Sequence, residues 1–168
     1  MIHLRPIRAE DADILFPLVF QTPVCDTLVW DGPSSLEEYR GWMTEHAEEV
    51  RAQKEHTFTI VENASGDPAG TIGVRPYSDQ SKADIGIWIG VPYQGKGYGA
   101  AAIRLAVEYG FTQLHLEKIE AYIFVGNHAS PRAFEKNGFQ LEGAVRRGHM
   151  KRGVLVDEWQ MARSVFFR

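Results

Sequence analysis

The chain has 168 residues, of which 44% are hydrophobic and 24% charged, and its formal net charge is −4 at pH 7. This is the composition of a globular protein, and we expect residues 1–168 to form a single domain. The negative charge argues against a general nucleic-acid binder. A lone cysteine excludes an internal disulfide, and the six histidines lack metal-ligand spacing, so no metal is expected. Without a signal-peptide pattern or a membrane-length apolar run, we expect a cytoplasmic protein with no membrane partner.

The first third of the chain predicts a strand followed by two helices. Residues 2–7 alternate apolar and polar side chains, as a half-buried strand does. A helix should start near Glu10, and Pro17 should kink or shorten it. The second helix should begin at residues 33–35, because Ser35 and Glu38 have the spacing of a capping box.

The remaining two thirds predict strands around one further long helix. Strands are expected over residues 56–62 and 69–74, joined by the turn at 63–67, and over 83–91 and 118–125. Residues 97–111 should form a helix, and residues 145–149 and 154–161 a closing hairpin around Lys151-Arg152-Gly153. This order predicts a mixed α/β fold.

A glycine-rich turn carries most of the functional information. An apolar strand and Pro92 lead into Gly95, Gly97 and Gly99, which would let backbone N–H groups approach a bulky anion. The helix that follows points its first unpaired N–H groups at the same place, so we predict a pyrophosphate site. The spacing fits neither a dinucleotide fingerprint nor a phosphate loop, because Lys96 is followed by Gly97 instead of Ser or Thr.

Two segments resemble one enzyme family. Gln94-x-x-Gly97-x-Gly99 resembles the coenzyme A signature of the GNAT N-acetyltransferases, and residues 127–139 resemble that family's second motif, N-x-x-S-x-x-A-F-E-K-x-G-F. The closest likeness is to the RimJ/RimL-like branch, and it covers nearly the whole chain. It implies a central, mostly antiparallel twisted sheet flanked by helices, with splayed strands at the coenzyme A site. It also implies acetyl-CoA as donor, coenzyme A as product, an amine acceptor and a possible homodimer.

The resemblance implies a set of donor contacts. The backbone of Trp88, Ile89 and Gly90 would face the thioester, and Asn127 would contact the pantetheine arm. Phe134 stands where many members carry a tyrosine whose hydroxyl lies near the sulfur, so this chain lacks that acid. The full set of expected donor-binding residues comprises Trp88, Ile89, Gly90, Gln94, Gly95, Lys96, Gly97, Tyr98, Gly99, Ala100, Asn127, Ser130, Phe134 and Lys136.

Three residues are candidates for proton transfer. His149 has a suitable ordinary pKa of about 6.5 and aligns with a glutamate thought to be the base in some RimL-like members, or it is a solvent-exposed hairpin histidine. Ser130 resembles a serine suggested as acid in those enzymes, or it is a plain helix N-cap before a proline. Asp84 could act through water, or be a hydrogen-bonded carboxylate at a strand end.

The acceptor is less defined by the sequence. Trp30, Asp31 and Tyr39 could form an aromatic pocket with a carboxylate for a cationic amine, although Tyr39 also suits a core position. The resemblance favours a protein N-terminal α-amine of the ribosomal-protein type or a small-molecule amine. Free amino acids, polyamines and amine drugs stay open as acceptors, as do a non-catalytic coenzyme A sensor and a nucleotide-binding regulatory module.

Overall fold

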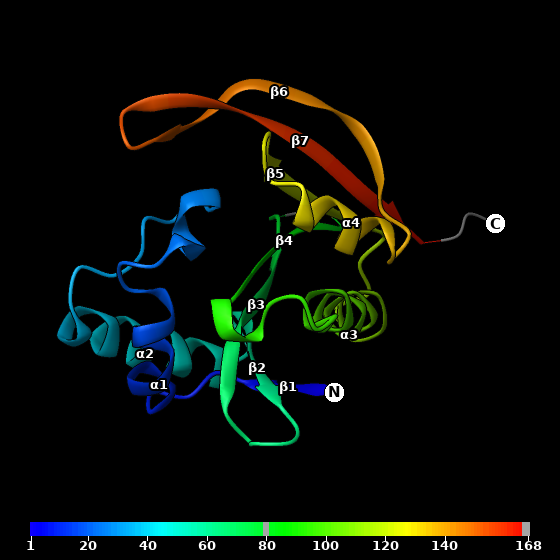
Figure 1. The fold of residues 1–168 in the computed structure, drawn as a ribbon. Coiled ribbons are helices and arrows are strands. Elements are labelled where there is room, and N and C mark those ends of the chain that lie inside the picture. Colours follow the sequence, from blue (N-terminus) through cyan, green and yellow to red (C-terminus); the bar gives the residue numbers. More distant parts are fainter. Residues whose placement is uncertain (79–80, 166–168) are drawn as a thin grey trace.

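The computed structural model describes residues 1–78 and 81–165 and contains a seven-stranded sheet of order β1-β2-β3-β4-β5-β7-β6 (Figure 1). All neighbouring strands run antiparallel except β4 and β5, which are parallel. The mixed, mostly antiparallel sheet confirms the predicted fold. The strands are β1 (Ile2–Pro6), β2 (His56–Glu62), β3 (Pro68–Pro76), β4 (Lys82–Ile89), β5 (Lys118–Phe124), β6 (Gln140–Lys151) and β7 (Val154–Ser164).

Helices cover both faces of the sheet. On one face lie α1 (Asp11–Val19), α2 (Leu36–Arg51) and the short 3-10 helix η1 (Pro23–Thr27), and on the other lie α3 (Tyr98–Thr112) and α4 (Ala129–Glu135). Each face has its own apolar core, one around Ile72, Ile103 and Ile119 and the other around Leu15 and Met43. Within the described ranges, no helix has both the length and the apolarity to cross a membrane.

Local signals set most element ends. The Ser35 hydroxyl accepts the Glu38 N–H at 3.1 Å, which confirms the predicted start of α2. Pro17 lies inside α1, which ends two residues later at Val19. The strand predicted to reach Val91 ends at Ile89 instead, because Val91–Tyr93 form a 3-10 turn around Pro92, which has no N–H for strand pairing.

The sheet splits between its two parallel strands. β4 and β5 pair only at Lys82 with Lys118, Ala83 with Ile119 and Asp84 with Glu120. Beyond that point β4 follows β3 to its end, and β5 follows β7 to its end. The two strands therefore diverge, and the sheet opens in its middle.

Candidate active site

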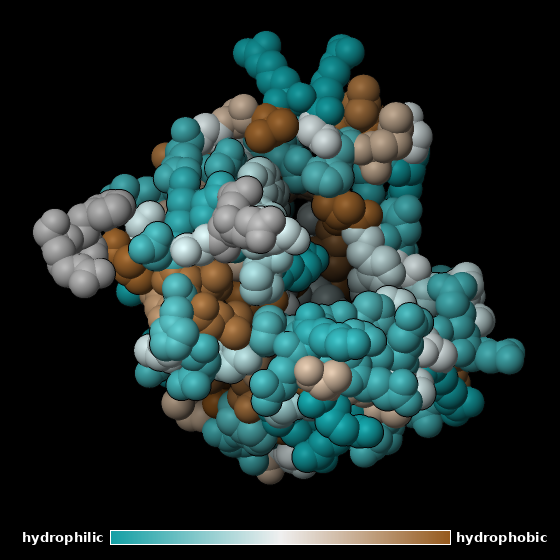
Figure 2. Space-filling model, turned by 180° about the vertical axis from the view of Figure 1, so that it is seen from behind, coloured by the Kyte–Doolittle hydropathy of each residue, from teal (hydrophilic) through white to brown (hydrophobic). Residues whose placement is uncertain are grey.

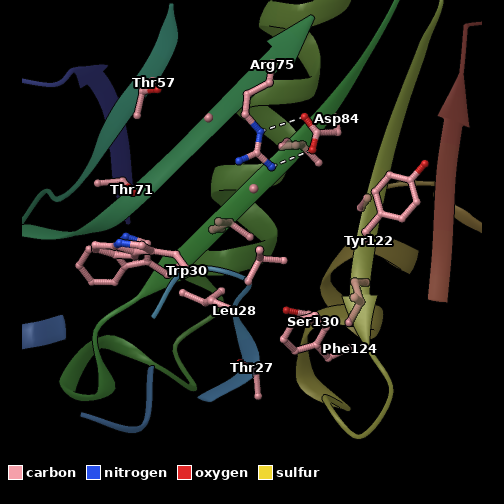
Figure 3. A pocket seen from close by; sticks show the side chains of 18 of the residues that line it. Thr27, Leu28, Trp30, Thr57, Thr71, Arg75, Asp84, Tyr122, Phe124 and Ser130 are labelled. Carbon is pink, nitrogen blue, oxygen red and sulfur yellow. Dashed lines mark hydrogen bonds and ion pairs between the residues drawn. The ribbon is translucent and has the colours of Figure 1, made fainter. Parts of the chain in front are cut away.

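A cavity of about 620 Å³ lies where β4 and β5 separate. Tyr122 and Phe124 of β5 lie on one side of it with Ser130 of α4, and Leu28 and Trp30 lie opposite (Figure 3). Seen from behind the view of Figure 1, the surface is hollowed, with hydrophobic side chains at the rim of the hollow (Figure 2). The opening of the sheet thus creates an accessible, largely apolar chamber.

The edge of β4 offers backbone groups to this chamber. Gly90 donates its N–H to the Ala69 carbonyl at 2.8 Å, so the expectation that Gly90 has a free N–H is wrong. Because successive residues of a strand point their N–H groups to opposite sides, Trp88 also bonds toward β3, and the amides of Ile87 and Ile89 point toward the gap. Ile89 is therefore the member of the predicted trio whose amide faces β5, and Ile87 joins it.

The turn after β4 presents a run of unpaired donors. Among the described residues, none accepts a hydrogen bond from the backbone N–H groups of residues 95–100, and the first helical bond is from Ala101 N–H to the Gly97 carbonyl. Gly95 and Gly97 have φ angles of 75° and 81°, in the left-handed region. These donors, at the positive end of α3, form an anion site of the kind that binds phosphate groups.

Side chains of the turn anchor it to the protein. The Gln94 amide donates to the Ile89 carbonyl at 2.8 Å, and the Tyr98 hydroxyl donates to Glu62 at 2.7 Å. That hydrogen bond holds the pKa of the Glu62 carboxyl below its usual range. Lys96 lies 3.4 Å from the same carboxylate. These contacts fix the shape of the turn and leave its backbone donors exposed.

The second sequence motif starts α4 beside the cavity. The Asn127 carboxamide oxygen accepts the Ser130 N–H at 3.2 Å, so it satisfies one N–H group in the first turn of α4, whose N-cap residue is His128. Ser130 is the second residue of α4, and its interpretation as the N-cap is wrong. Asn127, Ser130 and Phe134 all line the cavity, and Phe134 packs edge-on against Phe139 at 4.9 Å between ring centroids.

The end of α4 is tied to the start of α3. The Asn137 side chain donates to the carbonyls of Ala100 and Ala133, at 3.0 and 2.9 Å. The neighbouring Lys136 is exposed, which suits its expected contact with a phosphate-bearing donor. Asn137 lies within the motif quoted from the sequence, but the sequence gives no sign that it joins the two helices.

The three candidate proton-transfer residues all line the cavity in different settings. His149 has its Nδ1 atom 2.6 Å from the Oε1 atom of Glu158. Asp84 accepts two hydrogen bonds from Arg75, at 2.9 and 2.8 Å, so both its oxygens are occupied (Figure 3). Ser130 contributes a hydroxyl without such a partner among the described side chains. Of the three, His149 is the one that brings an imidazole with a neighbouring carboxylate to the cavity.

An aromatic row forms the opposite wall. Trp30, Tyr39 and Trp42 stack with centroid separations of 6.0 and 6.1 Å, and His46 follows Trp42 at 3.9 Å. Tyr39 lines the cavity although it is buried in the core, and burial raises the pKa of its phenol. Both interpretations of Tyr39 therefore apply.

The carboxylate on this wall is not the expected one. Asp31 does not line the cavity, and it pairs instead with Lys151 at 2.7 Å, a hydrogen bond that holds the pKa of Asp31 below its usual range. Glu55 takes its place, accepting a hydrogen bond from Thr57 at 3.0 Å and lying 2.6 Å from His46. The prediction of a pocket with Asp31 is corrected accordingly.

Residues 2–140 match the family model described as acetyltransferase (GNAT) domain. The chain belongs to the GNAT acetyltransferases. It is 29% identical over 167 residues to the probable N-acetyltransferase YjcK of Bacillus subtilis (strain 168), covering 96% of this chain and 92% of the relative. It is 31% identical over 166 residues to the L-amino acid N-acetyltransferase AaaT of Escherichia coli (strain K12), with coverage of 96% and 97%. Mycobacterium smegmatis RimJ in complex with CoA-disulfide has the same fold, with a TM-score of 0.87, 22% identity and coverage of 98% and 82%.

Membership in the GNAT family makes the protein an acetyl-CoA-dependent N-acetyltransferase. The unpaired donors of residues 95–100 fit a pyrophosphate-bearing donor of this kind. Sequence reasoning missed Glu55, Arg75 and Glu158 in the cavity wall. Each comes from a strand or strand end remote from the two motifs, and no local spacing signals that it faces the chamber.

Proposed function

We propose that the protein transfers the acetyl group of acetyl-CoA to the α-amine of a peptide or protein N-terminus, with His149 as proton acceptor. The observation that carries this proposal is the cavity at the split of the sheet. It brings an imidazole, unpaired strand amides and an aromatic wall to one chamber that borders the second family motif. The RimJ/RimL-like likeness of the sequence supports the same acceptor class.

The donor would enter from the α3 and α4 side. Backbone N–H groups of residues 95–100 would bind the pyrophosphate, with Lys96 and Lys136 adding positive charge nearby. The pantetheine arm would pass Asn127 and Ser130 toward the gap between β4 and β5. The amides of Ile87 and Ile89 are the donors available there for the thioester oxygen, on which negative charge grows during attack.

The chemical step would be direct transfer. The neutral amine attacks the thioester carbon, a C–N bond forms, the C–S bond breaks, and the electron pair of that bond leaves on sulfur. The amine loses one proton to His149, and the leaving thiolate can be protonated from solvent. With Phe134 in place of a tyrosine, the thiol's own acidity, with a pKa of about 8.5, must suffice. Cys25 does not line the cavity and burial raises its pKa, so we expect no acyl-enzyme.

An α-amine suits a weak base. Its ordinary pKa of about 7.7–8.0 leaves a useful neutral fraction near pH 7, whereas a lysine at about 10.4 is harder to deprotonate by about 3 to 4 kcal/mol. His149 lines the cavity, and a weak base such as an imidazole is sufficient to accept a proton from an α-amine. The acceptor is thus expected to be an α-amine in preference to a lysine side chain.

The charges of the cavity favour a peptide over a free amino acid. Among the described residues, Arg75 is the only lysine or arginine that lines the cavity, and its guanidinium already binds Asp84 through two hydrogen bonds. A free α-carboxylate would therefore meet three carboxylates, those of Glu55, Asp84 and Glu158, and one guanidinium that already has an acidic partner. A peptide N-terminus carries no such carboxylate near its amine.

The test is a comparison of acceptors, with acetyl-CoA as donor and release of free thiol as the readout. Four acceptors separate the classes: a lysine-free peptide with a free N-terminus, an N-terminally blocked peptide with one lysine, a free amino acid, and spermidine. We expect the first to react fastest, with the acetyl group located on its N-terminus by mass spectrometry. Faster reaction of any other acceptor would reject the acceptor class. Binding of coenzyme A without thiol release for any amine would favour a sensor.

A further inference from the structure

His149 reaches the cavity through an irregular stretch of β6. Val145 lies opposite Glu158, but the next paired residue, His149, lies opposite Val156, so residues 146–148 stand against Asp157 alone. Arg147 adopts a φ of 50° and donates its N–H to the Asp157 carboxylate at 2.8 Å. Extra residues on one strand form a bulge, which re-aims the side chains that follow.

The bulge is shaped around the Glu158 carboxylate. A Cβ atom at Gly148 would lie 2.5 Å from Oε1 of Glu158 and 2.9 Å from Val145, so any larger residue would push the carboxylate away. Gly148 has no left-handed backbone angle, and space is therefore what requires glycine at this position. The glycine at position 148 therefore leaves room for the Glu158 carboxylate.

The buried position of Glu158 lowers the stability of the folded protein. Glu158 is only 2% exposed, one oxygen lies 2.6 Å from His149 Nδ1, and the other is buried without a hydrogen-bond partner among the described residues. A buried polar atom without a hydrogen-bond partner destabilises the folded protein, because its contacts with water are lost and not replaced. An apolar residue of similar size would serve stability better. A purely structural role therefore does not account for this glutamate.

We infer that Glu158 is the positioning residue of a His149–Glu158 pair, an inference that rests on the proposed function. Its carboxylate accepts the Nδ1–H of the imidazole, which leaves the Nε2 lone pair for the proton of the acceptor amine. When Nε2 takes that proton, the ring becomes positive and the adjacent carboxylate stabilises it. The proton leaves Nε2 for solvent before the next turnover.

The other charged groups near His149 have partners of their own. Lys151, further along β6, is paired with Asp31, and Arg152 with Asp26, while Asp157 binds a backbone N–H. On β5 the ring nearest His149 is Phe124, at 6.4 Å between centroids. Among the described residues, Glu158 is the only charged group in hydrogen-bonding contact with the imidazole.

The first test reads the imidazole directly and needs no activity. Nitrogen-15 NMR of the ligand-free protein reports which ring nitrogen of His149 carries the proton. We expect the Nδ1–H form in the wild type and a shift to the Nε2–H form, preferred by free histidine, in Glu158→Leu. Glu142 is the control, because it lies on β6 like His149 but does not line the cavity, and its carboxylate pairs with Lys118 at 2.8 Å. Glu142→Gln should leave the tautomer unchanged. The same tautomer in the wild type and in Glu158→Leu would overturn the inference.

The second test separates positioning from structure by a double-mutant cycle. Glu158→Leu should lower kcat for an α-amine acceptor about tenfold or more and leave the KM for acetyl-CoA unchanged, as loss of general-base help predicts. In a His149→Ala background it should cost nothing further, whereas a structural role would give equal losses in both backgrounds. If Glu158→Leu does not fold, Glu158→Met replaces it in both tests, because methionine has a similar length and no oxygen to accept the Nδ1–H. If no amine accepts the acetyl group, the proposed function is rejected. The tautomer measurement tests the His149–Glu158 pair independently of that result, because it needs no activity.

Discussion

Gly97 combines an unusual backbone angle with an open position at the start of α3. Its φ is 81°, and a Cβ atom there would meet no other atom within 4 Å. The space beside it is where a bound pyrophosphate would approach the unpaired N–H groups of residues 95–100. In the proposed site, this glycine would form the turn through its backbone angle and leave room for the ligand through its lack of a side chain.

Replacing Gly97 with valine should abolish most of the affinity for acetyl-CoA, because the side chain blocks the approach of the phosphates and strains the turn. Isothermal titration with coenzyme A should show a loss of at least about tenfold in a folded variant. Gly153→Val is the matched control, since Gly153 also has a φ of 81° and open surroundings but lies in the β6–β7 turn. An unchanged affinity in Gly97→Val would reject the phosphate site.

At the scale of elements, the β6–β7 hairpin is fastened to the loop after η1. Lys151 is buried, with its Nζ 2.7 Å from Asp31 and 3.2 Å from the Trp30 carbonyl. The loop that carries Trp30 is thereby held against the hairpin that carries His149. This contact therefore links two segments that line the cavity, one with Trp30 and one with His149.

Lys151→Met should loosen the acceptor wall while keeping the length of the side chain. Loss of the hydrogen bonds from Lys151 to Asp31 and to the Trp30 carbonyl should raise the acceptor KM by about tenfold. The KM for acetyl-CoA should not change, and steady-state kinetics with each substrate varied measure both values. Arg152→Met is the control, because its pair with Asp26 is exposed on both sides and surface pairs contribute little. Equal effects of the two substitutions would contradict this role for Lys151.

The elements differ in how far the sequence could predict them. Strand β2 was predicted with its observed bounds, because the polar turn at 63–67 and the apolar alternation are local signals. The turn with unpaired backbone N–H groups at residues 95–100 could also be predicted, because its three glycines lie at alternate positions of one short segment. The charged residues of the cavity wall could not be predicted, because Glu55, Arg75 and Glu158 are brought to one cavity only by strand pairing and the bulge of β6.

For the molecule as a whole, one buried ion pair joins the first strand to two neighbouring elements. Asp11 accepts hydrogen bonds from Arg5 at 2.8 and 2.7 Å, from the Arg8 N–H at 3.0 Å and from the Thr59 hydroxyl at 2.7 Å. Burial alone would raise the pKa of Asp11, but these hydrogen bonds outweigh it and hold the pKa below its usual range. The ionised form is thus the one that the fold stabilises.

Asp11→Asn should lower the free energy of unfolding by about 3 kcal/mol at pH 7, because it removes one partner of a buried pair. A group whose pKa is lowered by folding stabilises the protein above its unfolded pKa of about 3.9 and loses that contribution as the pH falls through the folded pKa. Urea unfolding from pH 7 to pH 3 should therefore show a narrowing gap between wild type and variant. Asp13→Asn, whose pair with Arg40 is exposed on both sides, should change the free energy of unfolding far less than Asp11→Asn does. A gap that stays constant with pH would contradict the assignment.

The short pairing between β4 and β5 also shapes how the molecule moves. Within the described residues, three residue pairs join the strands β1 to β4 with the strands β5 to β7 in the sheet. Because few backbone hydrogen bonds hold this seam together, we expect its amide hydrogens to exchange with solvent faster than those of the longer β3–β4 pairing. A donor lying along β4 and an acceptor held between Trp30 and His149 would bridge that seam. Each substrate would then stiffen the site for the other, which couples their binding without any change of fold.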